Sequence, residues 1–403
     1  MLDIFLEIHA NLLEQLPSRF QRGVRGGLDL EAQAVGIYGP RGVGKTTMLL
    51  QHAQQTHGGP DVCLYISADH VAVAASGLFA LGRAYFQQGG QALILDEIHR
   101  SPDWGRQVKS LIDSYPNKKF YLSGSSALAL REKDADLSRR VLWSKLPCLS
   151  FREFLNLAYE VEFPPLSLQD ILAHHPKHAI AIRSQRPAIL ADLRDYMTYG
   201  YYPFFVQGKQ GFLQRLLAII DKVLAEDIPD LFGLDQSKIS SLRRLLWTIC
   251  SSAPFSPNID GLSRDLGLAK ESVYFYLDCL EKSGLLKAYR AFVSGGKIAR
   301  KAAKIYPANA NMLAAIVSQA SVRQELGMVR ETFLQATISE THTLHTHDKA
   351  DFLVDGSIVI EVGGPSKDLR QVRDHAGNGY LALDGIEVGS AQRVPLYLFG
   401  FLY

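Results

Sequence analysis

IYGPRGVGKTTMLL (residues 37–50) is the stretch that decides the fold of the first part of this chain. Apolar residues 34–38 lead into a glycine-rich turn, and the TTMLLQHAQQ that follows has a helical pattern. The turn fits G-x-x-x-x-G-K-[ST] without a mismatch, in the strand–turn–helix context that this motif requires. Its glycines let backbone N–H groups face phosphate oxygens, and the helix amino terminus adds positive potential. The stretch therefore predicts a phosphate-binding loop for a nucleoside triphosphate.

This loop and a second motif predict an ATP site with Mg²⁺. Lys45 is expected to reach the β- and γ-phosphates, and Thr46 to ligate the metal ion. Residues 93–97 (LILDE) form an apolar strand that ends in two carboxylates. Asp96 is expected to hold Mg²⁺ through water, and Glu97 to polarise the attacking water as general base. The predicted reaction is ATP hydrolysis to ADP and phosphate. The residues expected to bind the nucleotide are Gly39, Pro40, Arg41, Gly42, Val43, Gly44, Lys45, Thr46 and Thr47.

Two further groups are candidates for catalysis. Ser123 ends the predicted strand 119–123, between the two motifs, where it could contact the γ-phosphate or the attacking water; the alternative is an ordinary serine-rich turn. Arg139 and Arg140 follow an apparent loop after that strand, and one of them is a candidate arginine finger. The alternative is a pair of solvated surface arginines. A finger that acts on a neighbour's nucleotide predicts homo-oligomers when ATP is bound.

The pattern of apolar segments predicts an α/β fold and four domains. Strands at 34–38, 62–66, 92–96, 119–123 and 141–147 alternate with helical stretches, which is typical of a doubly wound parallel sheet. This sheet belongs to a predicted ATPase core over residues 1–155. Proline-punctuated helical sequence over 156–236, with its clearest helix at 212–228, predicts a helical lid. The predicted order helix, turn, helix, hairpin over 237–305 indicates a winged helix-turn-helix.

Residues 237–305 are also the basic part of the chain. They contain twelve Lys/Arg and five Asp/Glu, a net charge of +7, whereas the whole chain has +2. Lys270, Arg300 and Lys301 could contact DNA phosphates, which gives salt-dependent, largely sequence-neutral affinity. The alternative is a protein-contact module, because the predicted recognition helix also carries acidic residues.

Several segments resemble the archaeal-type AAA ATPase family found in bacteria and archaea. They are GPRGVGKTTMLLQ, LDEIHRSPDWGRQVKSLID, YLSGSS, LPCLSFREFL, and towards the end GMVRETF, ADFLV, IEVGG and LYLFGFLY. The resemblance implies a winged helix and a small C-terminal α/β nuclease-like domain, here 306–403. In the family an L-x-G-R segment follows the fourth strand. Arg140 matches its arginine and Arg139 replaces its glycine, so the resemblance leaves open which of the two is the finger.

The nuclease-like domain is expected to be degenerate. Glu331, Asp351 and Glu361 are the candidate metal ligands, but the lysine that such a nuclease needs two residues after the glutamate is Gly363. Lys367 could reach back from a following helix. We therefore expect no cleavage of DNA. Predicted elements in this domain are a helix at 325–338, strands around the turn Asp355-Gly356, a helix at 366–376 and a final strand from residue 394.

The composition of the chain bears on where in the cell the protein is expected to act. No apolar run is long enough to span a bilayer, and four scattered cysteines without metal-ligand spacing favour a reducing cytoplasm. The resulting prediction is an ATP-hydrolysing switch or remodelling protein associated with DNA. The alternatives are an ATP-gated metal-dependent nuclease and an ATP-dependent regulatory protein that does not act on nucleic acid.

Overall fold

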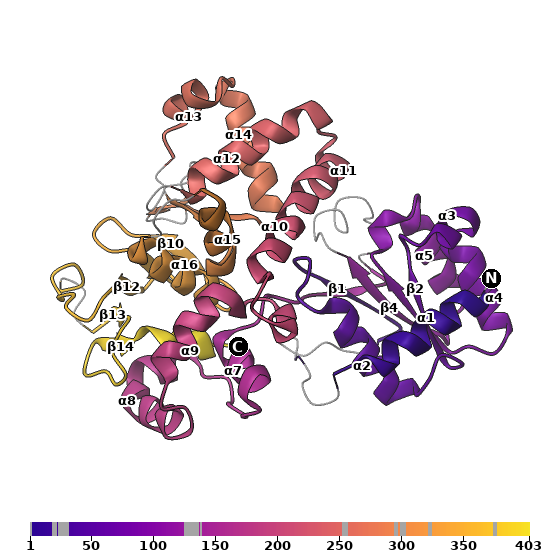
Figure 1. The fold of residues 1–403 in the computed structure, drawn as a ribbon, viewed down its shortest axis with the longest axis horizontal. Coiled ribbons are helices and arrows are strands. Elements are labelled where there is room, and N and C mark those ends of the chain that lie inside the picture. The colour runs from indigo at the N-terminus through magenta and orange to yellow at the C-terminus, as the bar shows by residue number, and fades with distance from the viewer. Residues whose placement is uncertain are drawn as a thin grey trace. The chain divides into compact units, whose positions relative to one another are not determined.

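The structure is a computed structural model of the chain, drawn in Figure 1. It describes residues 2–17, 22, 32–124, 137, 139–251, 257–293, 297–298, 304–320, 325–373 and 377–403. The chain divides into two compact units, Met1–Cys148 and Leu149–Tyr403. In the described part of the chain no helix is both long and apolar enough to cross a membrane.

The first unit contains a five-stranded parallel sheet with the order β2-β3-β4-β1-β5. Its strands are β1 (Ala34–Tyr38), β2 (Cys63–Ser67), β3 (Ala92–Asp96), β4 (Lys119–Gly124) and β5 (Leu142–Lys145). Its helices are α1 (Leu2–Glu14), α2 (Lys45–His57), α3 (Val71–Ser76), α4 (Leu78–Gln87), η1 (Ile98–Arg100) and α5 (Trp104–Ser114). The predicted α/β class with a parallel sheet is confirmed.

Helices cover both faces of this sheet, which explains why its strands are nearly continuous apolar runs. Every residue of β3 is buried. Side chains from α1, α4 and α5 share one core with alternate residues of the strands, among them Leu93 and Leu95. Tyr121 points to the other face, where it contacts His52 and His57 of α2. The loop before α2 therefore lies at the carboxyl edge of the sheet, next to the ends of β3 and β4.

The second unit begins with helical sequence. Its first elements are α7 (Phe151–Tyr159), α8 (Leu168–Gln185), α9 (Ile189–Asp195), η2 (Tyr196–Gly200), η3 (Pro203–Gln207), α10 (Phe212–Lys222), η4 (Val223–Asp227) and α11 (Ile228–Phe232). The single helix predicted at 212–228 is α10 followed by a π-helical turn, η4, and the start of α11. Pro229 explains the break, because a proline inside a helix removes a backbone donor and crowds the preceding turn.

A 3₁₀ turn, three α-helices and two antiparallel strand pairs follow. They are η5 (Gln236–Lys238), α12 (Ile239–Cys250), α13 (Ile259–Leu266), α14 (Lys270–Lys282), β6 (Leu286–Tyr289) and β9 (Lys304–Pro307), with β7 (Phe292–Val293) and β8 (Lys297–Ile298) between the paired strands. Gly267 closes α13 in a left-handed conformation, φ 66°, which explains the sharp turn into α14. The border predicted between residues 305 and 306 falls inside β9.

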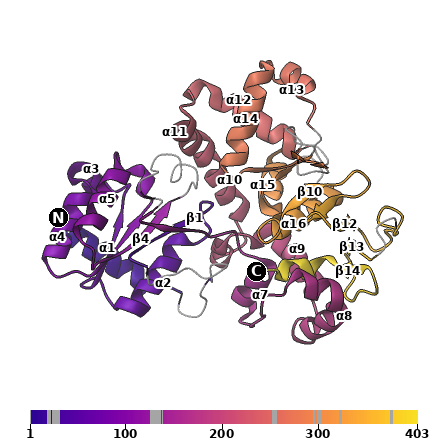
Figure 2. The ribbon, with the colours of Figure 1, turned by 180° about the vertical axis from the view of Figure 1, so that it is seen from behind.

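The remainder is a mixed five-stranded sheet with two helices. The elements are α15 (Ala310–Ala320), α16 (Leu326–Ile338), β10 (Leu344–Thr346), β11 (Phe352–Val354), β12 (Ile358–Gly363), β13 (Gly379–Leu383), β14 (Arg393–Pro395) and η6 (Leu396–Phe401). Strands β10 to β12 are antiparallel and β12 to β14 are parallel. Asp355 and Gly356, both at positive φ, form the predicted turn between β11 and β12. Figure 2 shows this sheet beside α16.

Two predictions for this region are wrong. Residues 366–373 form turns instead of a helix, because the Arg393 guanidinium takes the carbonyls of Lys367 and Pro365, at 3.0 and 2.6 Å. The apolar end of the chain is a strand only over β14 and then becomes η6. Every residue of η6 is buried, so the segment lacks the polar alternation of a half-exposed strand.

Candidate functional site

The loop between β1 and α2 has the geometry of a phosphate-binding loop. Gly42 and Gly44 have φ of 81° and 93°, values that residues with a side chain rarely adopt. A Cβ on Gly39 would lie 2.2 Å from the carbonyl oxygen of Leu146, so only glycine fits there. The Lys45 side chain is buried, and its ammonium donates to the carbonyl oxygens of Gly39 and Pro40, both at 3.0 Å.

A hydrogen-bond network joins this loop to the end of β3. The Thr46 hydroxyl donates to Asp96 Oδ2 at 2.6 Å, across fifty residues of sequence. Ser123 lies at the end of β4, between β1 and β3, and its buried hydroxyl donates to Asp96 Oδ1. Hydroxyl and carboxylate oxygens are the donors that Mg²⁺ prefers, so Thr46 and Asp96 fit the ion predicted for them.

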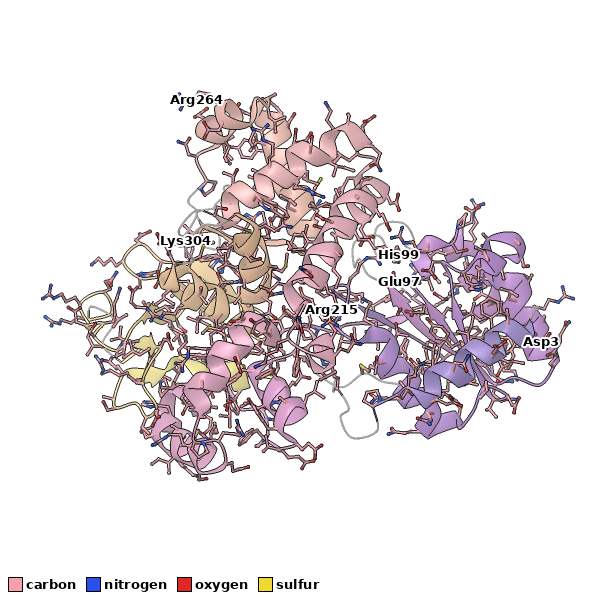
Figure 3. All side chains as sticks on the ribbon, in the orientation of Figure 1. Asp3, Glu97, His99, Arg215, Arg264 and Lys304 are labelled. Atoms are coloured by element: carbon pink, nitrogen blue, oxygen red, sulfur yellow. The ribbon has the colours of Figure 1, made fainter. Side chains whose placement is uncertain are left out.

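Glu97 follows β3 in a left-handed conformation, φ 50°. Its backbone N–H donates to Asp96 Oδ1 and to the Ser123 hydroxyl, at 3.1 and 3.3 Å. One carboxylate oxygen lies 3.9 Å from Arg41 Nη2 and 3.5 Å from His99 Nε2. Figure 3 labels Glu97 and His99 beside each other in the first unit. The side chain thus lies next to Arg41, the third residue of the phosphate-binding loop.

Two residues of this site, Tyr65 and His99, were missed by the sequence analysis. Arg41 was assigned to nucleotide binding but not to a contact with Glu97. Arg41 and His99 contact Glu97, and the Tyr65 hydroxyl donates to Asp96 Oδ2 at 2.9 Å. Burial and the adjacent Asp96 charge raise the pKa of Tyr65, so the phenol stays protonated and remains a donor. No sequence motif marks Tyr65, because its position beside Asp96 depends on the pairing of β2 with β3.

Arg140 lies apart from these residues. It precedes β5, at the amino edge of the sheet, and its guanidinium makes a two-point contact with the carboxylate of Asp113, at 2.7 and 3.1 Å. Arg139 beside it is exposed. Neither arginine is therefore placed to act on a nucleotide bound in the same domain, and a catalytic role for either needs a second copy of the chain.

The lysines at the two ends of α14, the predicted recognition helix, form ion pairs with acidic side chains. Lys270 contacts Asp260, and Lys282 contacts Asp278 at 3.0 Å. The exposed face of α14 also carries Tyr274 and Phe275. Arg300 and Lys301 lie outside the described residues. Phosphate groups would have to compete with these carboxylates for the lysines.

The three nuclease-like carboxylates come together in the second unit. Glu331 is on α16, Asp351 lies just before β11, and Glu361 is on β12. Two ammonium groups, of Lys304 and Lys367, contact them. Among the described residues, no group of three His, Cys, Asp or Glu side chains is arranged to hold a metal ion. The predicted residues therefore meet, but as an ion-pair cluster.

Two parts of the chain match known protein families. Residues 31–155 match the family described as "AAA domain", and residues 190–324 match the family described as "Domain of unknown function (DUF8612)". An uncharacterized protein of Methanocaldococcus jannaschii is 28% identical over 283 residues, which is 67% of this chain and 59% of that protein. The matched region thus spans less than two thirds of that relative's length.

Similar solved structures include AMPPCP-bound DnaA from Aquifex aeolicus, with 15% identity and a TM-score of 0.26 over 68% of this chain and 86% of DnaA. A katanin structure has 20% identity and a TM-score of 0.25 over 48% of this chain and 72% of katanin. PCH-2 of C. elegans has 14% identity and a TM-score of 0.25 over 61% and 62% of the two chains. Similarities at this level carry no argument about function.

Proposed function

We propose that this chain, whose residues 31–155 form an AAA domain, is an ATP-hydrolysing switch or remodelling protein. The observation that supports this most is the Thr46–Asp96 hydrogen bond, which brings the phosphate-binding loop and the acidic end of β3 to one place. Release of phosphate from ATP by the purified chain tests the proposal. A chain that binds ATP and never releases phosphate would instead be a nucleotide-dependent regulatory protein.

Each residue of the site has a role in the proposed reaction. Lys45 leaves the loop carbonyls to bind phosphate oxygens, and the backbone N–H groups of the loop bind the remaining phosphate charge. Thr46 and Asp96 would hold Mg²⁺, which neutralises phosphate charge. Glu97 orients the attacking water and accepts its proton. Ser123 holds the Asp96 carboxylate and the Glu97 backbone in position.

We propose that ATP-bound chains associate, so that Arg140 reaches the γ-phosphate of a neighbour. Its place at the amino edge of the sheet supports an action in trans. Arg140→Ala is expected to lower ATP turnover at least ~10³-fold, because an arginine finger contributes roughly 10³–10⁵ in rate. Arg139→Ala is the matched control and should retain turnover. Light scattering with a slowly hydrolysed ATP analogue measures the association; a monomer with a fully active Arg140→Ala variant would rule this mechanism out.

Contact with DNA through residues 237–305 is the second part of the proposal, and the net charge of +7 supports it. Affinity for DNA should be modest, because phosphates must compete with the carboxylates that already contact Lys270 and Lys282. It should also depend steeply on salt, because the binding energy comes from neutralising phosphates. We expect affinity to fall by about 0.9 log units per log unit of salt for each phosphate neutralised. Charge reversal at Lys270, Arg300 and Lys301 should weaken binding to all sequences about equally. It should also lower that slope by roughly one for each phosphate that the variant no longer neutralises.

Gel shifts across a salt series measure both quantities. A matched control reverses three exposed charges outside the basic segment, at Lys177, Arg194 and Lys209. This control should leave DNA affinity unchanged. If the unmodified chain shows no shift even at low salt, residues 237–305 form a protein-contact module, and the alternative without a nucleic-acid role takes first place.

A further inference from the structure

The second unit contains a cluster of charges that the proposed ATPase activity does not use. We call it the carboxylate–ammonium centre; its members are Glu331, Asp351, Glu361, Lys304 and Lys367. Glu361 is 2% exposed and Glu331 9% exposed. Carboxylates buried this far are costly unless a cation and hydrogen-bond donors compensate their charge. The identity of that cation therefore decides what the centre can do.

Lys304, labelled in Figure 3, supplies the cation for two of the carboxylates. It comes from β9, and its ammonium lies 3.1 Å from Asp351 Oδ1 and 3.5 Å from Glu331 Oε2. The hydroxyl of Tyr306, on the same strand, donates to that Glu331 oxygen at 2.6 Å. Burial lowers the pKa of Lys304, but the Asp351 and Glu331 charges outweigh it and raise the pKa overall, so the ammonium stays charged. A positive charge thus lies between the carboxylates of α16 and of the C-terminal sheet.

The other carboxylate oxygens have donors of their own. Glu361 Oε2 accepts from the backbone N–H of Asp351, and Asp351 Oδ2 accepts from that of Val362, both at 3.0 Å. Glu361 Oε1 lies 2.5 Å from the ammonium of Lys367. A divalent metal ion needs several of these oxygens directed at one point, and here they are directed at amides, a phenol and two ammonium groups.

Lys367 takes the place of a side chain that the sequence lacks. A Cβ added to Gly363 would lie 2.7 Å from both Cβ and Cγ of Lys367. The stem of Lys367 therefore fills the space next to Gly363, and its ammonium reaches Glu361 from the turn after β12. Lys367 thus supplies the ammonium that a lysine at position 363 would supply. The glycine at position 363 alone therefore does not explain why the three carboxylates are not arranged to hold a metal ion.

We propose that Lys304 is a built-in cation that takes the position of a divalent metal ion and excludes Mg²⁺ and Mn²⁺ from these carboxylates. The ion pairs of the centre then connect β9 to α16 and to the C-terminal sheet. Because Lys304 comes from β9, a substitution can remove its charge while Glu331, Asp351 and Glu361 stay unchanged. Removal of Lys304 is therefore predicted to create a metal site that the unmodified chain does not have. This inference does not depend on ATP hydrolysis.

The test measures Mn²⁺ binding to the full chain without nucleotide, by the loss of the electron paramagnetic resonance signal of free Mn²⁺. Lys304→Met, which keeps the length of the stem and removes the charge, should gain about one bound Mn²⁺ per chain, held by the carboxylate oxygens that the ammonium contacts in the unmodified chain. The double variant Lys304→Met with Glu331→Gln should lose that ion again, because Glu331 is one of the two carboxylates that Lys304 contacts, and this loss locates the ion at the centre. Lys349→Met, at an exposed lysine two residues before Asp351, is the matched control and should gain nothing.

Two results would overturn the proposal. Equal Mn²⁺ binding by the unmodified chain, lost on Glu331→Gln, would mean that Lys304 does not exclude metal. A folded Lys304→Met chain that binds no Mn²⁺ would mean that the carboxylates form no cation site. If Lys304→Met does not fold, amine labelling of the unmodified chain decides: Lys304 should react far more slowly than Lys349, equally with and without Mn²⁺. Faster labelling in Mn²⁺ would show that metal displaces the ammonium.

Discussion

Lys45→Ala is expected to weaken ATP binding at least ~100-fold, because hydrogen bonds to charged groups are worth about 1.5–3 kcal/mol each and Lys45 is proposed to make more than one to the phosphates. The Lys45 side chain is buried in the loop. Titration with a fluorescent ATP analogue measures the loss directly. Phosphate release should fall with it, since the nucleotide no longer reaches the site.

The matched control for this prediction is Lys109→Ala, which removes a partly exposed lysine from α5 of the same unit. It should bind ATP normally. Thermal unfolding of both variants separates lost affinity from lost folding, because Lys45→Ala also removes the donor of the Gly39 and Pro40 carbonyls. A folded Lys45→Ala chain with normal affinity would mean that the nucleotide site lies elsewhere.

Glu97→Gln should keep ATP affinity and lose at least ~100-fold in turnover, which is the usual contribution of a positioned general base. The amide has the shape of the carboxylate but cannot accept the proton of the attacking water. The backbone bonds from Glu97 to Asp96 and Ser123 do not involve the side chain, so the site should keep its geometry. A phosphate-release assay at saturating ATP measures the effect.

Glu7→Gln, at an exposed position of α1, is the matched substitution and should leave turnover unchanged. Two outcomes would change the assignment. Normal turnover by Glu97→Gln would exclude it as the base. A loss of ATP affinity equal to the loss of turnover would mean that the contact of Glu97 with Arg41 organises the loop for binding and not for the chemical step.

The geometry of the loop between β1 and α2 could be predicted from the sequence, because the motif that specifies it is one continuous stretch of chain. A strand, a glycine-rich turn and a helix are contiguous, so Gly42, Gly44 and Lys45 could be assigned from spacing alone. The end of β3 could be placed beside them because parallel strands share one carboxyl edge. Tyr65 could not be found this way, since its contact with Asp96 depends on which strands are neighbours and on their register.

The second unit was less predictable because its segments carry no such motif. The turns after residue 365 are held by Arg393, whose side chain comes from a strand almost thirty residues later. Likewise, the cation between Asp351 and Glu331 comes from β9, far earlier in the sequence. Local pattern identifies acidic residues as candidate ligands, but only the tertiary fold shows that a lysine already neutralises them.

The two carbonyl contacts of Lys45 bear on how quickly spent nucleotide is exchanged. If the Lys45 ammonium had no hydrogen-bond partner after ADP left, the free-energy barrier to ADP release would include the cost of a buried, unpaired charge. Here Gly39 and Pro40 offer oxygens 3.0 Å from the ammonium, so the lysine can change partners as the phosphates leave. In the proposed ATPase cycle, the barrier to release of ADP therefore does not include that cost.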